Sequence, residues 1–310
     1  MATTQLRVFW FFLPLTFTAF LCGGGNAVSQ DAPTTAETIN VWPDLAPGET
    51  TKLKGETLPF RPEENPPVVR VSGITQPTLA CYPPKVNSTG AAVLILPGGA
   101  FGRVVTNKEG SEIAEWLNGH GITAFVLSYR TIANDATKDE KANAWKKPVQ
   151  DAQRSLSLIR SRAAEWKLRK DRIGIMGFSA GGQAAARVIC LNNERTYDAT
   201  DTIDSESIRP DFSLLVYPWN LTVGKEANLL PELTVPKDCG PVFLVHTHDD
   251  GASSLSSALF YVALKQQNIP AELHVFGNGG HGYGMRPVAD SNVATWPTLA
   301  EPWLKRMLSK

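Results

Sequence analysis

The sequence has no excess of charge of either sign, because 30 lysines and arginines balance 30 aspartates and glutamates. Nucleic acids and anionic membranes attract proteins through clustered positive charge, so this composition favours neither partner. A long apolar run is also missing. The run at residues 8–21 is interrupted by Pro14 and is shorter than the roughly 20 residues of a transmembrane helix. We therefore expect no nucleic-acid partner, no stable membrane insertion of the mature chain, and an uncharged or small substrate.

Cysteine is scarce, with 4 residues in 310. Cys81, Cys190 and Cys239 are widely spaced, so at most one bridge forms among them, which excludes a disulfide-stapled scaffold. The fold must depend on its apolar core instead, and 43% hydrophobic residues are ample for one large core. Internal repeats and coiled-coil patterns are absent, so we predict a single globular domain.

The N-terminus has the pattern of an export signal. Arg7 is its only charge, the apolar run at 8–21 follows, and small residues stand at Ala27 and Ser29. This spacing is typical of a signal-peptidase site. The sequence therefore predicts a signal peptide over residues 1–29 and a secreted or periplasmic protein.

A retained N-terminal anchor and a lipoprotein modified at Cys22 are the alternatives. Phe20 and Leu21 are bulky for the residues before a lipoprotein cysteine, which favours release. After the signal, residues 30–77 are rich in Pro, Thr and Glu and predict an N-terminal arm packed on the domain, extended or folded as an edge hairpin. We assign no chemistry to this arm.

The catalytic domain is predicted over residues 78–310, where apolar, β-branched runs alternate with segments of helical spacing. This alternation is typical of one doubly wound α/β domain, with a mostly parallel sheet and helices on both faces. Segments 192–210 and 219–240 are short, which predicts little or no lid. The predicted strands are 92–96, 122–127, 173–176, 212–217, 242–247 and 273–276; the predicted helices are 111–118, 149–166, 182–191, 256–267 and 296–307.

Ser179 stands in Gly177-Phe-Ser-Ala-Gly181, between a predicted strand and a predicted helix. This is the G-x-S-x-G pattern in the strand–turn–helix context that exposes a nucleophilic serine. The glycines are expected because side chains there would collide with the neighbouring strand and helix. A helix start also directs free N–H groups toward developing negative charge, so Ala180 is a candidate oxyanion donor. The alternative is a tight turn without chemistry.

The loop Pro97-Gly98-Gly99-Ala100-Phe101-Gly102 follows an earlier predicted strand. Glycine there allows backbone amides to approach a substrate oxygen, so Gly99 and Ala100 are the candidates for the remaining oxyanion donors. An ordinary glycine-rich turn is the alternative.

A serine nucleophile needs a general base, and His281 is the candidate among five histidines. It follows the last predicted strand, as the chain order Ser, Asp, His requires, and flanking glycines let its loop reach Ser179. His274 and His120 are expected to be packing or surface residues, and His246 to be structural.

The orienting acid is expected directly after the strand at 242–247, where Asp249 and Asp250 both qualify. We favour Asp250, four residues beyond His246, and expect Asp249 to be a neighbour or a local cap. A zinc site formed by His246, His248 and Asp250 is a competing interpretation, since H-x-H-x-D is a metal-ligand spacing. Gly251 stands where that motif requires a further histidine, so we predict no metal and no cofactor.

These motifs resemble the secreted esterase branch of the α/β-hydrolases related to hormone-sensitive lipase and acetyl-xylan esterases. The likeness extends from about Asn40 to the end. It implies an α/β-hydrolase fold, a triad of Ser179, Asp250 and His281, and an oxyanion hole at Gly99, Ala100 and Ala180. The motifs that carry it are PGGAF at 97–101, Ser128-Tyr129-Arg130, GFSAGG at 177–182, the acidic pair at 249–250 and GGHGYG at 279–284.

The resemblance also implies a carboxylic-ester hydrolase that removes acetyl or feruloyl groups from sugars or plant polysaccharide such as xylan. Two departures stand out: Pro97 replaces the histidine of H-G-G-G, and Gly251-Ala252 replaces Pro-Val after the acid. A prolyl-oligopeptidase-like serine peptidase and a non-catalytic binding protein on a hydrolase scaffold are the alternative functions. The oligomeric state, the use of the sequons at Asn87 and Asn220, and disulfide formation stay open.

Overall fold

The computed structural model describes residues 1–2, 37–84, 87–133, 135–224 and 227–309. The predicted signal peptide, apart from its first two residues, lies outside the described residues, as do Cys22 and the first residues of the arm, 30–36. Cys81, Cys190 and Cys239 are free thiols. The described fold therefore rests on packing and hydrogen bonds.

Eight strands form the main sheet, in the order β1-β4-β7-β5-β8-β9-β10-β11. Strand β4 is antiparallel to both of its neighbours, and all pairs from β7 to β11 are parallel, so the predicted mostly parallel sheet is confirmed. The strands are β1 (Glu37–Asn40), β4 (Thr78–Tyr82), β5 (Ala92–Leu96), β7 (Thr123–Ser128), β8 (Ile173–Phe178), β9 (Ser213–Val216), β10 (Val242–Thr247) and β11 (Ala271–Phe276).

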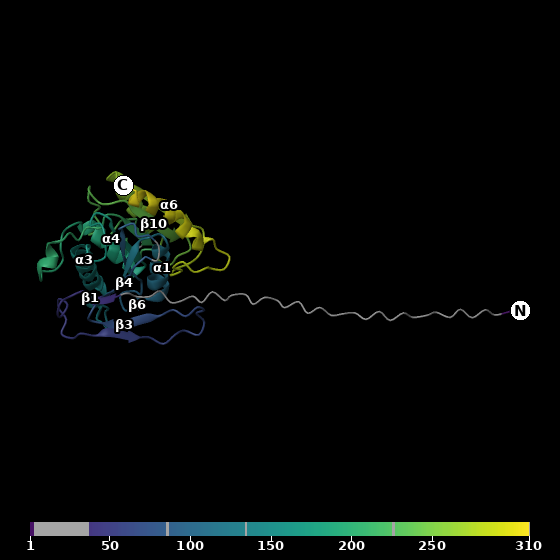
Figure 1. The fold of residues 1–310 in the computed structure, drawn as a ribbon, viewed down its shortest axis with the longest axis horizontal. Coiled ribbons are helices and arrows are strands. Elements are labelled where there is room, and N and C mark those ends of the chain that lie inside the picture. Colours follow the sequence, from purple (N-terminus) through teal and green to yellow (C-terminus); the bar gives the residue numbers. More distant parts are fainter. Residues whose placement is uncertain (3–36, 85–86, 134, 225–226, 310) are drawn as a thin grey trace. The chain divides into compact units, whose positions relative to one another are not determined.

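Helices cover both faces of this sheet, because successive side chains of its buried strands point to opposite sides. In β5, Leu94 and Leu96 belong to one core cluster and Val93 and Ile95 to another. The first cluster lies under α3 (Lys146–Ser161), α4 (Ala180–Leu191) and α5 (Leu255–Gln266); the second lies under α1 (Glu112–Gly119) and α6 (Trp296–Leu308). Figure 1 shows α3 and α4 on one side of the strands and α1 and α6 on the other.

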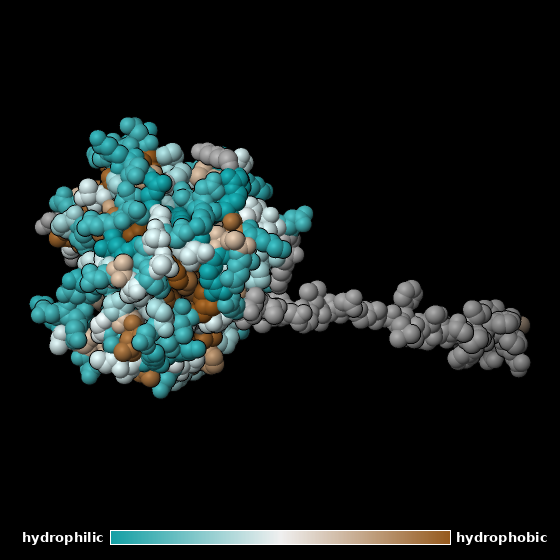
Figure 2. All heavy atoms as spheres, turned by 60° about the vertical axis from the view of Figure 1, so that its left-hand side comes forward, coloured by the Kyte–Doolittle hydropathy of each residue, from teal (hydrophilic) through white to brown (hydrophobic). Residues whose placement is uncertain are grey.

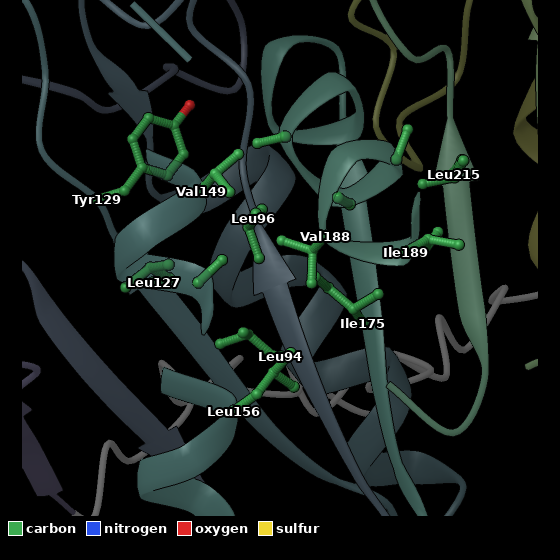
Figure 3. Packing of buried hydrophobic residues seen from close by; sticks show 14 of the residues in the cluster. Leu94, Leu96, Leu127, Tyr129, Val149, Leu156, Ile175, Val188, Ile189 and Leu215 are labelled. Atoms are coloured by element: carbon green, nitrogen blue, oxygen red, sulfur yellow. The ribbon is translucent and has the colours of Figure 1, made fainter. Parts of the chain in front are cut away.

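The first core is closely packed around the centre of the sheet. Leu156 from α3 lies beside Leu94 of β5, and Val188 from α4 lies beside Ile175 of β8 (Figure 3). All four side chains are completely buried. Burial of an aliphatic side chain of this size stabilises the fold by about 1.5–3 kcal/mol, so these helices fix the strand ends that carry the chemistry.

The arm contributes to both sheets. Its strand β1 is the edge strand of the main sheet, next to β4. Its strands β2 (Lys54–Thr57) and β3 (Arg70–Ile74) join β6 (Val104–Val105) in a second, antiparallel sheet. Because β6 follows the 97–102 loop directly, this small sheet lies beside the expected oxyanion loop.

A buried polar cluster ties the arm to α3. The Trp42 indole N–H donates to Asp151 Oδ1 at 2.8 Å, and the Arg130 backbone N–H and guanidinium donate to the same carboxylate at 2.9–3.0 Å. The Arg130 and Asp151 side chains are both fully buried. A buried charge pair of this kind is costly to break from one side, so it fixes the position of the arm.

Segments 192–210 and 219–240, the two candidates for a lid, contain no α-helix among their described residues. The segment 192–210 contains the short 3-10 turn η2 (Thr202–Ser205), and Asp201 and Asp204 there pair with Arg154 of α3.

No helix of the described residues is long and apolar enough to cross a membrane. The face in Figure 2 is mostly hydrophilic, with hydrophobic residues in small groups. The remaining helices are α2 (Lys138–Ala142), the π-helical turn η1 (Asn107–Ser111) and the 3-10 turn η3 (Val293–Thr295).

Candidate active site

Ser179 lies in the sharp turn between β8 and α4, with φ 53° and ψ −120°. This left-handed backbone is costly for a residue with a Cβ, and such strain is typical of functional positions. The flanking glycines are required by close contact. A Cβ at Gly177 would lie 2.4 Å from the Gly181 carbonyl oxygen, and one at Gly181 would lie 2.1 Å from the Leu96 carbonyl oxygen. The collisions expected from the sequence are therefore present.

The loop that carries His281 follows β11 and is held by β10. The exposed carboxylate of Asp249 accepts hydrogen bonds from the backbone N–H groups of Gly280 at 2.9 Å and Gly279 at 3.2 Å, which lowers the pKa of Asp249. The Thr247 hydroxyl donates to the Gly280 carbonyl at 2.6 Å. Asp249 is thus the cap of the histidine loop, as expected for the acid that lies outside the triad.

Ser179, His281 and Asp250 meet at one point above the sheet. His281 Nε2 lies 2.7 Å from Ser179 Oγ, and His281 Nδ1 lies 2.7 Å from Asp250 Oδ2. Because the carboxylate only accepts, Nδ1 carries the proton in this arrangement and Nε2 is free to accept from the serine hydroxyl. The geometry thus places a serine hydroxyl, an imidazole and a carboxylate in series.

Asp250 has a buried side chain with several partners. Its Oδ1 accepts the Ala252 N–H at 2.7 Å, and His246 Nε2 lies 3.2 Å from its Oδ2. Burial alone would raise the pKa of Asp250, but His246, His281 and the Ala252 N–H together lower it to about 2. The acid therefore stays ionised throughout the neutral range. His246 is itself fully buried, with Nδ1 2.8 Å from the Ser257 hydroxyl, as a structural histidine would be.

The 97–102 loop lies next to Ser179 with unpaired amides. Gly99 has φ 136° and Ala100 has φ 54°, and both line the cavity that contains Ser179. Within the described residues, neither of their N–H groups donates a hydrogen bond to the chain. Ala180 is the first residue of α4, where the amide has no partner within the helix. Gly99 and Ala100 thus line the cavity beside Ser179, and Ala180 follows Ser179 directly, so all three candidate oxyanion donors lie near this serine.

A buried network links the two loops, and the sequence analysis missed it. Glu109 Oε2 accepts the Gly98 N–H at 2.7 Å, and Glu109 Oε1 accepts the Tyr217 hydroxyl at 2.9 Å. The same hydroxyl accepts the Gly284 N–H at 2.9 Å, and the Tyr217 ring lies 5.0 Å from that of His281. The network therefore fixes the position of the 97–102 loop (the oxyanion loop) relative to the 279–284 loop that carries His281 (the histidine loop). The position of Tyr217 at the carboxyl end of a predicted strand was the only sequence signal.

The cavity around Ser179 has a volume of about 510 Å³, within the usual range for small-ligand sites. Trp219, whose backbone N–H donates to the Ser179 carbonyl oxygen, is the one described residue of segment 219–240 that lines the cavity, which agrees with the prediction of little or no lid. Charged residues from the arm and from the loop before α1 complete the wall: Arg61, Glu64, Arg70, Arg103, Lys108 and Glu109.

The zinc interpretation finds no geometric support in the described residues, among which no three His, Cys, Asp or Glu side chains are arranged to hold a metal ion. His248 is exposed, whereas His246 is buried against Ser257. The two remaining histidines lie away from the triad: His274 packs on Phe243 with ring centroids 4.9 Å apart, and His120 lies 3.5 Å from Glu301.

Comparison with known proteins gives one family match and relatives with names of xylan-acting enzymes. Residues 79–216 match the BD-FAE family. The chain is 26% identical over 230 residues to an acetylxylan esterase of Xylanibacter ruminicola, covering 66% of this chain and 43% of that protein. It is 30% identical over 284 residues to endo-1,4-beta-xylanase B of Butyrivibrio fibrisolvens, covering 83% of this chain and 42% of that protein. The chain thus spans less than half the length of both curated relatives.

Solved structures agree in fold. An acetyl ester-xyloside bifunctional hydrolase from Caldicellulosiruptor lactoaceticus has a TM-score of 0.68 and 26% identity, covering 90% of this chain and 98% of that one. An esterase from Thermogutta terrifontis has a TM-score of 0.60 and 20% identity, covering 82% of this chain and 94% of that one. The second likeness concerns the fold alone. The sheet, the motifs and the similar structures together show an α/β-hydrolase fold, and the chain is similar to esterases of the branch related to acetylxylan esterases.

Proposed function

We propose that the chain is a serine carboxylic-ester hydrolase that removes acetyl groups from xylan or from xylan-derived sugars. The observation that supports this most strongly is the continuous chain of contacts from Ser179 Oγ through His281 to Asp250, at 2.7 Å each, inside an open cavity. Feruloyl esters are the second acyl class to test.

The reaction begins when His281 Nε2 takes the proton of Ser179 as its oxygen attacks the ester carbonyl. The tetrahedral oxyanion accepts hydrogen bonds from the amides of Gly99, Ala100 and Ala180, which form strong bonds only when the charge develops. His281 then protonates the leaving sugar hydroxyl. Water, deprotonated by His281, attacks the acyl-serine and releases acetate and the free enzyme.

Several features support an acetylated sugar as substrate. The relative from Xylanibacter ruminicola is an acetylxylan esterase, and the structure from Caldicellulosiruptor lactoaceticus is an acetyl ester-xyloside hydrolase. The cavity is open, polar in part, and borders the partly exposed Trp219, whose ring offers a sugar an apolar surface. These features suit a small acyl group on a bulky polar alcohol better than a long lipid chain.

The decisive experiment is intact-mass labelling with a fluorophosphonate, followed by acetate release from acetylated xylo-oligosaccharides. We expect one adduct on the wild-type chain and none on Ser179→Ala. A prolyl-peptide amide serves as the peptidase substrate and p-nitrophenyl ferulate as the feruloyl substrate. Faster cleavage of the amide than of p-nitrophenyl acetate would favour a prolyl-oligopeptidase-like activity, and a labelled but inactive chain would favour a binding protein. Labelling that persists in Ser179→Ala would refute the proposed nucleophile.

We also propose that the chain is exported, on the basis of the apolar run at 8–21 and the small residues Ala27 and Ser29. N-terminal sequencing of exported protein should find a start near residue 30. A start at a lipid-modified Cys22, or an intact N-terminus in the membrane fraction, would contradict cleavage near Ser29.

A further inference from the structure

We propose that the active-site cavity binds a carboxylate of its substrate through Arg103 and Lys108, with Arg61 at the rim, so that acidic sugar esters are preferred to neutral ones. This inference rests on the proposed function and names its substrate class. It also differs from the neutral substrate that the overall charge balance led us to expect.

The three cations come from two segments that the small antiparallel sheet brings together. Arg103 and Lys108 flank β6, directly after the oxyanion loop, and Arg61 belongs to the arm segment that precedes β3. A Cβ on Gly99 would lie 3.0 Å from Arg103 Cγ, so the arginine side chain starts beside the oxyanion loop itself. All three line the same cavity as Ser179. A group bound by them would therefore belong to the molecule whose ester is cleaved.

The carboxylates that line the cavity form hydrogen bonds with groups other than Arg103 and Lys108. Glu64 pairs with Arg70 through both of its oxygens, and Arg61 is only 3.9 Å away from it. The two oxygens of Glu109 accept the Gly98 N–H and the Tyr217 hydroxyl, and Asp250 is bound to His281. Within the described residues, no hydrogen bond or ion pair engages the side chain of Arg103 or Lys108.

The neighbouring negative charges neutralise Arg103 and Lys108 only in part. Burial lowers the pKa of Arg103, and the neighbouring charges of Arg61 and Arg70 lower it further. Burial also lowers the pKa of Lys108; the charges of Arg286 and Arg70 act in the same direction, while those of Glu109 and Glu64 oppose this shift only in part. Cations that are half-buried and mutually repelling are stabilised when an anion joins them. A cleft also strengthens that attraction relative to open solvent.

A carboxylate is the anion that fits an ester substrate. The planar guanidinium of Arg103 can hold both carboxylate oxygens, while the ammonium of Lys108 acts as a point charge. In an acetylated plant oligosaccharide, such a group is a uronic acid on the alcohol side. A dicarboxylic half-ester would instead place it on the acyl side. Both share one chemistry, and matched substrates separate them.

The test compares two substrate pairs. The first is an acetylated xylo-oligosaccharide with a uronic acid branch and the same compound with that carboxyl group reduced to an alcohol. The second is a succinate half-ester and its methyl ester. Because a charge-assisted hydrogen bond contributes about 1.5–3 kcal/mol, we expect the acidic member of one pair to have about 10- to 100-fold higher kcat/KM. The preferred pair identifies where the carboxylate lies.

Substitutions then test which side chains cause the preference for the acidic substrate. Arg103→Gln and Lys108→Gln should each lower the acid-to-neutral ratio of kcat/KM by about fivefold or more. The control Arg169→Gln, an exposed arginine paired with Asp171, should leave the ratio unchanged. The wild-type ratio should also fall as NaCl rises from about 20 mM to about 500 mM. This salt dependence and Lys108→Gln carry the test if Arg103→Gln does not fold.

The outcomes separate this inference from the proposed function. Hydrolysis of the neutral esters with ratios below about 2 in both pairs would overturn the carboxylate subsite and leave the esterase intact. A preference that survives both substitutions would overturn it as well. If no ester is cleaved, the proposed function fails. Calorimetric titration of Ser179→Ala with the uronic acid compound then tests the subsite directly, with binding supporting it and no binding overturning it.

Discussion

Replacing Tyr217 by phenylalanine removes one hydroxyl that holds two active-site loops. This hydroxyl donates to Glu109 Oε1 and accepts the Gly284 N–H, both at 2.9 Å, and the residue is completely buried. The substitution would leave a buried carboxylate oxygen and a buried amide without these partners. The bond to the charged group contributes about 1.5–3 kcal/mol and the other about 1 kcal/mol, so Tyr217→Phe should destabilise the fold by about 3 kcal/mol.

Thermal unfolding followed by circular dichroism measures this change. For a chain of this size, a loss of about 3 kcal/mol lowers Tm by roughly 5–10 °C. The oxyanion loop and the histidine loop would also lose their common anchor. Small misplacements of catalytic groups slow the chemical step strongly, so we expect kcat for p-nitrophenyl acetate to fall about tenfold or more, with a smaller change in KM.

Tyr283 provides the matched control. It is buried beside Tyr217, with ring centroids 4.4 Å apart, but its hydroxyl has no hydrogen-bond partner among the described residues. Tyr283→Phe removes an unsatisfied polar group and should leave Tm unchanged or raise it. Equal effects of the two substitutions, or a Tyr217→Phe variant with wild-type Tm and kcat, would refute the role of the Glu109 network.

Three further results are expected. Asp250→Asn should lower kcat by about 10³- to 10⁴-fold because the amide no longer stabilises the productive histidine tautomer, whereas Asp249→Asn, which changes only a loop cap, should cost less than about tenfold. Because the pKa of Asp250 is lowered to about 2 in the fold, the ionised carboxylate stabilises the fold above about pH 4, and this stabilisation is lost as the pH falls toward 2. Denaturant titrations should show that the free energy of unfolding of the wild type falls by about 2 kcal/mol more than that of Asp250→Asn between these pH values. Ser179→Gly should be about 1 kcal/mol more stable than Ser179→Ala by thermal unfolding, because glycine relieves the left-handed backbone at φ 53°.

Local patterns were sufficient to predict the six parallel strands of the main sheet, but not its antiparallel strands β1 and β4. The limits expected for 92–96 and 242–247 are those of β5 and β10, since both strands are buried along their whole length and bounded by turn residues. Strand β11 begins two residues earlier than expected, at Ala271. It is a half-exposed edge strand, and Glu272 disguises its start. Helix α3 begins three residues before and ends five residues before the predicted limits, because Ala163–Trp166 continue in turns after it.

The sequence also predicted some residues of the candidate site and not others. Ser179, Asp250 and His281 were identifiable because each follows a strand of one parallel sheet, and such strands place their carboxyl ends at one edge. The Glu109–Tyr217 contact spans 108 residues and has no local signal. The cluster of Arg61, Arg103 and Lys108 could not be predicted from the sequence either, since Arg61 and Arg103 approach each other only when β3 pairs with β6. Composition, which is neutral overall, could not reveal a local imbalance.

The small sheet of β2, β3 and β6 separates two properties of this molecule. The proposed reacting groups follow strands of the large parallel sheet, while the arm and the residues on either side of β6 supply charged side chains of the cavity wall. Under the two proposals above, substrate choice and hydrolysis depend on different pieces of backbone. Grafting the arm of a relative onto this chain is a route to a new specificity, provided that Gly98, Glu109 and Tyr217 keep their contacts.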